Sequence, residues 1–213
     1  MKLLDDFTIK FDTREIVKLL RRPNSSKKPS ENLLKEIEEL YTEALSLINT
    51  KAIFDIFPSS KLTPRHMFTL SEYTILAICT LSDSIENKIS KLIESGELSK
   101  GVILDAIASH AAELLADELN KKIILEFSSL VEGKKITKRF SPGYCRWTIE
   151  EGQKLIFSLL PAEKIKVKLS NSMMMIPRKS ISFALNIGEK VEKELGEKEC
   201  DSCNMFDCEF RRS

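Results

Sequence analysis

The sequence predicts an α+β fold in which a largely antiparallel β-sheet packs against one long helix rich in small residues and against flanking helices. Segments with strand-like and helix-like patterns are interspersed along the 213 residues without the regular strand–helix–strand rhythm of a parallel sheet. One long helical segment carries alanine and serine through its middle, where small side chains let another element approach closely. We therefore expect this helix to be central and to pack against the sheet.

Residues 1–60 are expected to form an N-terminal helical extension. Alternating apolar residues predict a short strand over Phe7–Phe11. Asp12 and Glu15 have the spacing of a capping box, which predicts a helix from about Thr13 to Arg22. A second, amphipathic helix begins near Ser30, because apolar residues then recur at three- and four-residue spacing. These residues are Leu33, Leu34, Ile37, Leu40, Tyr41, Ala44, Leu45 and Ile48.

The middle of the chain contains two predicted strands and two predicted helices. Lys51–Phe57 alternates in polarity, and Glu72–Thr80 is rich in β-branched residues, so both segments predict strands. A helix is expected over Asp83–Ser95, with Gly96 as its C-cap. The long helix follows, from about Leu98 to Glu126. Its small residues are Ala106, Ala108, Ser109, Ala111, Ala112 and Ala116.

The C-terminal third begins with a predicted strand over Lys135–Phe140 that ends in a tight turn. Pro142 and Gly143 suit a type II turn, because proline fixes φ near −65° and glycine accepts a positive φ. Thr148 and Glu151 form a capping box that opens a helix through residue 160. Two further strands are expected, at Lys166–Leu169 and Ser180–Ile187. We expect domain boundaries near residues 60 and 195, followed by a cysteine-rich tail over residues 196–213.

The composition argues against several classes of protein. Lysine and arginine number 33 against 32 aspartate and glutamate residues, so no net field draws the chain onto nucleic acid. Its apolar runs are far shorter than the roughly 20 residues of a membrane-spanning helix. No secretory signal pattern opens the chain, and its odd number of cysteines, five, does not suggest a disulfide framework. We therefore expect a cytoplasmic protein with neither a nucleic-acid nor a membrane partner.

Arg139 is the first candidate binding residue, because it combines a cation at a strand end with a turn directly after it. A guanidinium group can hold a carboxylate or a phosphate through two parallel hydrogen bonds. Gly143 in the turn removes a side chain where a ligand could contact the main chain. The alternative interpretation is a solvated arginine, a structural turn and a core tyrosine at Tyr144.

Two motifs resemble a known family. Arg139-Phe140-Ser141-Pro142-Gly143-Tyr144, with Trp147 and Gln153 behind it, is similar to the R-x-x-P-G-Y signature of the activation domain of cobalamin-dependent methionine synthase. The segment from Leu169 to Ser182 resembles the same family's L-T-E-S-x-M-M-x-P-x-x-S-V-S segment. The helix around Leu104-Asp105-Ala106 is similar to its long helix rich in small residues. The resemblance covers roughly residues 70 to 187, so residues 61–195 are expected to form an activation-like domain.

This resemblance implies that the chain binds S-adenosylmethionine and supports reductive remethylation of the cobalamin of a separate methionine synthase that lacks its own activation domain. A flavodoxin-like protein would supply the electron, and the partner would hold the cobalamin. Arg139 would hold the ligand's carboxylate, with the main chain of Phe140, Ser141 and Gly143 along the ligand and Tyr144 facing the corrin. No residue is expected to act as a general acid or base, because the cofactors supply the reactivity. Another corrinoid methyltransferase is the alternative partner.

Cys200, Cys203 and Cys208 suggest a second hypothesis from a different class. Their C-x2-C-x4-C spacing suits three thiolate ligands of a zinc ion or an iron–sulfur cluster. A fourth ligand would come from Cys79, Cys145, an outside group or the partner. On this hypothesis the chain is a redox protein that carries a metal or cluster; a thiol–disulfide role and no function at all are the other interpretations.

Two other signals favour packing over chemistry. His110 lies on the small-residue helix and is interpreted as a packed or hydrogen-bonded core residue. The run Met173–Met175 could line a corrin face, although methionine more commonly fills gaps in a core.

Overall fold

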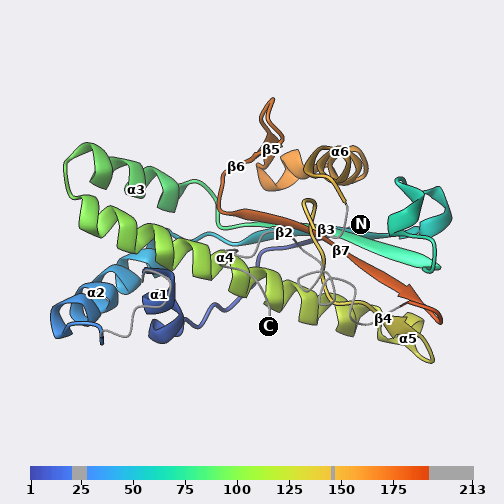
Figure 1. Cartoon of the computed structure of the whole chain (residues 1–213), viewed down its shortest axis with the longest axis horizontal. Helices are drawn as coiled ribbons and strands as arrows, with labels where there is room; N and C mark the ends of the chain where they lie inside the picture. Colours follow the sequence, from blue (N-terminus) through green and yellow to red (C-terminus); the bar gives the residue numbers. More distant parts are fainter. Residues whose placement is uncertain (21–27, 145–146, 192–213) are drawn as a thin grey trace.

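A computed structural model describes residues 1–20, 28–144 and 147–191, which form three layers with a β-sheet in the middle (Figure 1). Neighbouring strands of this sheet are antiparallel throughout, and the sheet has five strands. In spatial order they are β1 (Lys2–Leu4), β2 (Lys51–Pro58), β3 (Tyr73–Thr80), β7 (Ser180–Gly188) and β4 (Lys135–Ile136). The predicted α+β class is therefore confirmed.

Helices cover both faces of the sheet (Figure 1). One face carries α1 (Thr13–Leu20), α2 (Glu31–Leu47), α3 (Ser84–Glu94) and α4 (Leu98–Glu126), with the short α5 (Ser128–Val131) after α4. The other face carries α6 (Ile149–Leu159), a 3-10 helix over Ala162–Ile165, and a hairpin of β5 (Lys168–Leu169) and β6 (Met175–Ile176). Two further 3-10 turns, Ser59–Lys61 and Arg65–Met67, follow β2.

The central position predicted for the small-residue helix is confirmed in α4. Ala108, Ala111 and Ala116 are fully buried, so the backbone of α4 lies close to its neighbours. Gly101 has the same effect toward α3, because a Cβ added there would lie 2.9 Å from Ile93 Cγ1. Small side chains thus allow α4 to contact the sheet and the helices α1, α2 and α3 at once.

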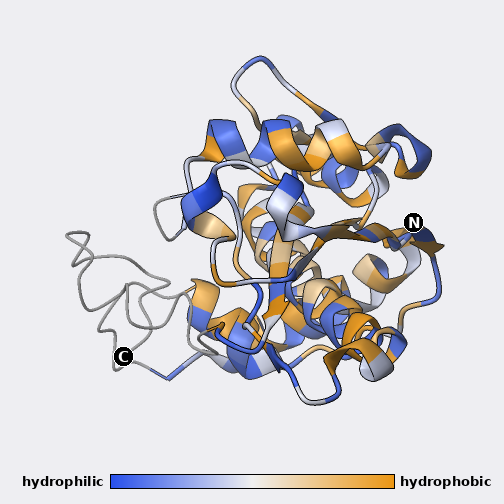
Figure 2. Cartoon of the chain, turned by 90° about the vertical axis from the view of Figure 1, so that its right-hand side faces the viewer, coloured by the Kyte–Doolittle hydropathy of each residue, from blue (hydrophilic) through white to orange (hydrophobic). Residues whose placement is uncertain are grey.

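Strand alternation divides the apolar residues into two cores. On β3, Ala77 and Cys79 point toward α4, whereas Leu76 and Ile78 point toward α6. In Figure 2 the helices show both hydrophobic and hydrophilic stretches, as expected when each one buries only one side. Because β2, β3 and β7 each contribute side chains to both cores, the sheet joins the two helical layers.

The first 60 residues contribute strands as well as helices. β1 pairs with β2, and β2 pairs along its whole length with β3. α2 begins at the predicted place, where the Ser30 side chain accepts a hydrogen bond from the Leu33 N–H. Ile37 and Ala44 of α2 lie in the same core as α4. The domain boundary near residue 60 therefore remains a prediction from sequence. The core under α4 continues across it.

Three strand predictions are corrected. Phe7–Phe11 is not a strand: its apolar side chains pack against the core beside α4, and no described strand lies next to it to pair with. The strand predicted over Lys135–Phe140 is regular only at its first two residues. The strand predicted over Lys166–Leu169 is shorter and belongs to the separate hairpin with β6. Among the described helices, none combines the length and apolar character needed to cross a lipid bilayer.

Candidate functional site

A β-bulge determines which way Arg139 points. Ile136 pairs with Ile187, whereas Phe140 bridges to Ala184, so one extra residue lies between these two pairs on the outer segment. In a regular strand, residues 136 and 140 would face the same side. Instead Ile136 packs in the core under α4, and Phe140 packs in the opposite core. The bulge at residues 138 and 139 therefore directs Arg139 toward α4.

Arg139 lies between two carboxylates of α4. Its Nη2 is 2.5 Å from Glu113 Oε2, and its Nε is 3.1 Å from Asp117 Oδ1. Glu113 and Asp117 are four residues apart and therefore lie on one side of the helix. The guanidinium side chain is 16% exposed, whereas each carboxylate side chain is 56% exposed. A half-exposed acidic pair thus lies over a largely buried cation.

The surroundings of Arg139 favour its protonated, positively charged form. Burial acts to lower the pKa of Arg139, but the hydrogen bond and charge of Glu113, together with Asp117, outweigh burial and raise that pKa above its ordinary value. Nη1 donates no hydrogen bond to any residue within 1–20, 28–144 or 147–191. The site therefore offers two carboxylates and the Nη1 group of Arg139, which bonds to none of the described residues.

The predicted type II turn follows directly. The Tyr144 N–H donates to the Ser141 carbonyl at 3.1 Å, and Gly143 has a φ of 95°. The Gly143 N–H donates to the Trp147 carbonyl at 2.7 Å, which folds the chain back toward α6. Tyr144 is 55% exposed. The turn thus crosses from the side of α4 to the side of α6 at the edge of the sheet.

Helix α6 supports the turn from behind. Thr148 caps the helix as predicted, since its hydroxyl accepts the Glu151 N–H and donates to the Glu151 carboxylate. A Cβ at Gly152 would lie 2.6 Å from Pro142 and 2.9 Å from Trp147, so only glycine lets the helix pack this closely. Trp147 is buried edge-on against Phe68, and its indole N–H has no hydrogen-bond partner among the described residues.

The predicted site residues lie along one continuous segment but in different surroundings. Phe140 is buried, and its N–H and carbonyl are both bonded to Ala184. Ser141 is half-buried, and Gly143 and Tyr144 are exposed. Their roles as ligand contacts remain predictions. Glu113 and Asp117 were not predicted; the four-residue spacing of acidic residues on the helix was the available signal, but it did not reveal their contact with Arg139.

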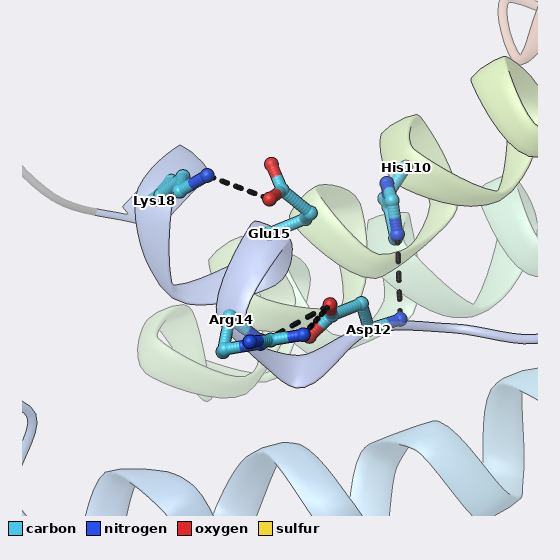
Figure 3. Close-up of polar contacts among 5 residues, drawn as sticks. All are labelled: Asp12, Arg14, Glu15, Lys18 and His110. Atoms are coloured by element: carbon cyan, nitrogen blue, oxygen red, sulfur yellow. Dashed lines mark hydrogen bonds and ion pairs between the residues drawn. The ribbon is translucent and has the colours of Figure 1, made fainter.

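The N-terminal segment lies along α4 beside this cluster. The Asp12 N–H donates to His110 Nε2 at 3.5 Å, and the Asp12 carboxylate holds Arg14 (Figure 3). Burial lowers the pKa of His110, against the opposing charges of Glu15, Asp12, Glu113 and Asp117. His110 is a hydrogen-bonded, half-buried residue, as predicted, and lies three residues before Glu113 on the same helix.

The cysteine hypothesis receives no support from the described part of the chain. Cys200, Cys203, Cys208 and Cys145 lie outside the described residues. Cys79 is buried under α4, and burial raises the pKa of its thiol to about 12, which disfavours the thiolate that a metal needs. No group of three possible metal-ligating side chains occurs within the described residues. The metal site remains a prediction from sequence.

A charged cluster on a long helix, facing a bulged sheet edge and a glycine turn, defines a small α+β binding domain. Residues 69–193 match the family described as "Vitamin B12 dependent methionine synthase, activation domain". The chain therefore belongs to this family, as the two sequence motifs indicated.

A solved structure has a similar fold. The structure titled "Crystal Structure of the MetH Reactivation Domain bound to AdoHcy" is similar with a TM-score of 0.59 and 13% sequence identity, covering 89% of this chain and 81% of that chain. At this identity the likeness concerns the fold. No curated protein matches the chain.

Proposed function

We propose that this chain binds S-adenosylmethionine at the cluster of Arg139, Glu113 and Asp117, and supports reductive remethylation of the cobalamin of a separate methionine synthase that lacks its own activation domain. The observation that supports this most is the pairing of a largely buried arginine with two half-exposed carboxylates, beside the family's turn motif. The solved relative with a similar fold is bound to AdoHcy, the demethylated form of the same ligand.

The charges of the cluster match those of the ligand. S-adenosylmethionine carries an ammonium, a sulfonium and a carboxylate group. Glu113 and Asp117 complement the two cations, and the Nη1 side of Arg139 complements the carboxylate. Because Arg139 also holds both carboxylates in place, it both contacts and positions groups in this proposal.

The turn of residues 141–144 would contribute to ligand binding through its shape and not through charged groups. Gly143 has no side chain of its own, and a Cβ there would lie 3.1 Å from Ile149 Cγ1, so a ligand held by Arg139 would approach the main chain of Ser141 to Gly143 from the side that Ile149 leaves open. Phe140 would act mainly through packing, since both of its backbone hydrogen-bonding groups are bonded to Ala184. Tyr144 and Ile149 are each 55% exposed at the turn, and we propose that they face the partner's corrin ring.

When bound, S-adenosylmethionine supplies a sulfonium methyl group for a cobalamin that has received one electron from a flavodoxin-like donor, and S-adenosylhomocysteine is the product. The residues of this chain bind and orient the methyl donor and exclude water from one side of it. Such positioning converts an encounter in solution into a step within a complex. No general acid or base is needed, so none is assigned.

Calorimetry with S-adenosylhomocysteine tests the binding site. We expect Arg139→Ala to weaken binding by roughly 2 to 5 kcal/mol, as for the loss of one partner of a buried charge pair. Asp117→Asn should also weaken binding, because it removes a charge that faces the ammonium group of S-adenosylhomocysteine. Glu118→Gln is the matched control, since Glu118 is the next residue on α4 and pairs with Lys121 instead. Unchanged affinity in both the Arg139 and Asp117 variants would overturn this assignment of the site.

A reconstitution assay tests the function in trans. The chain is mixed with a methionine synthase that lacks an activation domain and holds inactive cob(II)alamin, together with a reductant and S-adenosylmethionine. Turnover should return only when the chain, the reductant and S-adenosylmethionine are all present. Return of activity with a different corrinoid methyltransferase, and none with the synthase, would assign the chain to the alternative partner.

A further inference from the structure

His110 lies between the N-terminal segment and the candidate ligand site. Its Nε2 atom accepts the Asp12 N–H (Figure 3), and the ring of Phe11 lies beside the imidazole at a centroid distance of 6.1 Å. Glu113 and Asp117 follow His110 by three and seven residues, so these three side chains lie on one side of α4. A group that can gain a proton is therefore next to the two carboxylates assigned to the ligand.

Burial and charge act on the His110 ring in opposite directions. Burial disfavours the protonated ring and lowers the pKa of His110, whereas the charges of four carboxylates favour protonation. These carboxylates are those of Glu15, Asp12, Glu113 and Asp117. Neutralising any one of them would lower the proton affinity of the ring further.

Two of the four carboxylates are paired within the N-terminal segment. Asp12 Oδ2 lies 2.8 Å from Arg14 Nη2, and Glu15 Oε1 lies 2.6 Å from Lys18 Nζ (Figure 3). Each of these acids has a cation of its own. The field that they exert on His110 is therefore set by the chain itself.

The other two carboxylates are open to a ligand. Glu113 and Asp117 share the single guanidinium of Arg139, and each of their side chains is 56% exposed. Two negative charges thus face one positive charge, which leaves room for a second cation. That cation can be the ammonium group of a ligand or the protonated ring of His110.

We propose that His110 makes ligand binding sensitive to pH: the neutral ring permits binding, and the protonated ring competes with the ammonium group of the ligand for Glu113 and Asp117. This inference rests on the proposed function, because it needs that ammonium group at these two carboxylates. Linkage is reciprocal, so a bound ligand lowers the proton affinity of His110 by the factor by which protonation weakens binding. Affinity is full above the pKa of His110 in the free chain and declines as the pH falls through it.

An NMR titration of the unaltered chain tests the coupling directly. The pKa of His110 is measured with and without saturating S-adenosylhomocysteine, whose ammonium and carboxylate groups keep their charges in this pH range. The pKa should be lower when the ligand is bound. A pKa of His110 that the ligand leaves unchanged or raises would overturn the proposal.

Calorimetry with two histidine variants gives an independent readout. The unaltered chain should bind S-adenosylhomocysteine about twofold or more weakly at pH 5.5 than at pH 7.5. His110→Gln should lose most of this difference, because its amide can accept the Asp12 N–H but does not titrate. His66→Gln is the matched control and should keep the difference, since His66 is exposed on the turn over Arg65–Met67, whose Met67 packs in the core opposite α4. An equal decrease in all three proteins would assign the pH dependence to other groups.

The possible failures are distinguishable. If the unaltered chain does not bind S-adenosylhomocysteine at pH 7.5, the proposed function fails and this inference fails with it. If the chain binds the ligand and the pKa of His110 does not respond, only the coupling to pH is overturned. The NMR titration needs no substitution, so it decides the matter even if His110→Gln does not fold.

Discussion

His110 connects the N-terminal segment to α4 through a nitrogen that must be unprotonated to accept the Asp12 N–H. Burial lowers the pKa of His110 relative to its ordinary value of 6.5. A histidine whose folded pKa is lowered contributes stability that is complete above its unfolded pKa and is lost as the pH falls through the folded value. Acid should therefore loosen the contact of α1 with α4.

The first prediction follows from this linkage. The free energy of unfolding, measured by urea denaturation, should be lower at pH 5.5 than at pH 7.5, and NMR titration should place the folded pKa of His110 below 6.5. In His110→Gln, which does not titrate, the part of this decrease due to His110 should disappear. An equal decrease in both proteins would show that other groups cause it.

At the scale of the element, α6 and the turn form one packed unit. Pro142 and Trp147 both lie against Gly152, at distances that leave no room for a Cβ. The turn that leads away from Arg139 is therefore held from behind by a helix whose own start is fixed by the Thr148 cap. Any change that moves α6 outward should also move the turn.

The second prediction concerns Gly152→Ala. The added methyl group would overlap Pro142 and Trp147, so we expect a loss of about 1 to 3 kcal/mol in stability, as for overpacked cores. Binding of S-adenosylhomocysteine should weaken at the same time. Ser158→Ala, at an exposed position of the same helix, should leave stability and binding nearly unchanged. A Gly152→Ala protein as stable as the unaltered chain would contradict the packing described for α6.

At the scale of the whole molecule, the folded core begins earlier in the sequence than the segment that matches the family. The match begins at residue 69, yet β1 and β2 complete the sheet and Phe54 lies in the core beneath α4. Removing these strands would expose the edge of β3 and the buried face of α4.

The third prediction is therefore that a fragment of residues 61–195 does not fold cooperatively by itself. Circular dichroism should show no sharp thermal transition for the fragment, whereas the full chain should show one. A cooperative melt of the fragment would show that residues 1–60 are an accessory and not part of the core.

Features that depend on neighbouring residues could be predicted from the sequence. The amphipathic α2, the small-residue α4, the Thr148 cap and the turn at Pro142 and Gly143 all follow from local spacing and backbone preference. The family resemblance followed from the same local motifs. These signals are local because capping, helical periodicity and turn geometry involve residues within a few positions of each other.

Contacts between residues that are far apart in the sequence became visible only in the folded chain. One extra residue in a bulge turned Arg139 toward α4, and this joined it to Glu113 and Asp117, which precede it by 26 and 22 positions. The same holds for Lys179 with Asp105 and for Asp12 with His110, which are far apart in the chain. A bulge and a helix–sheet contact depend on strand register and packing, and residue spacing along one chain does not encode these directly.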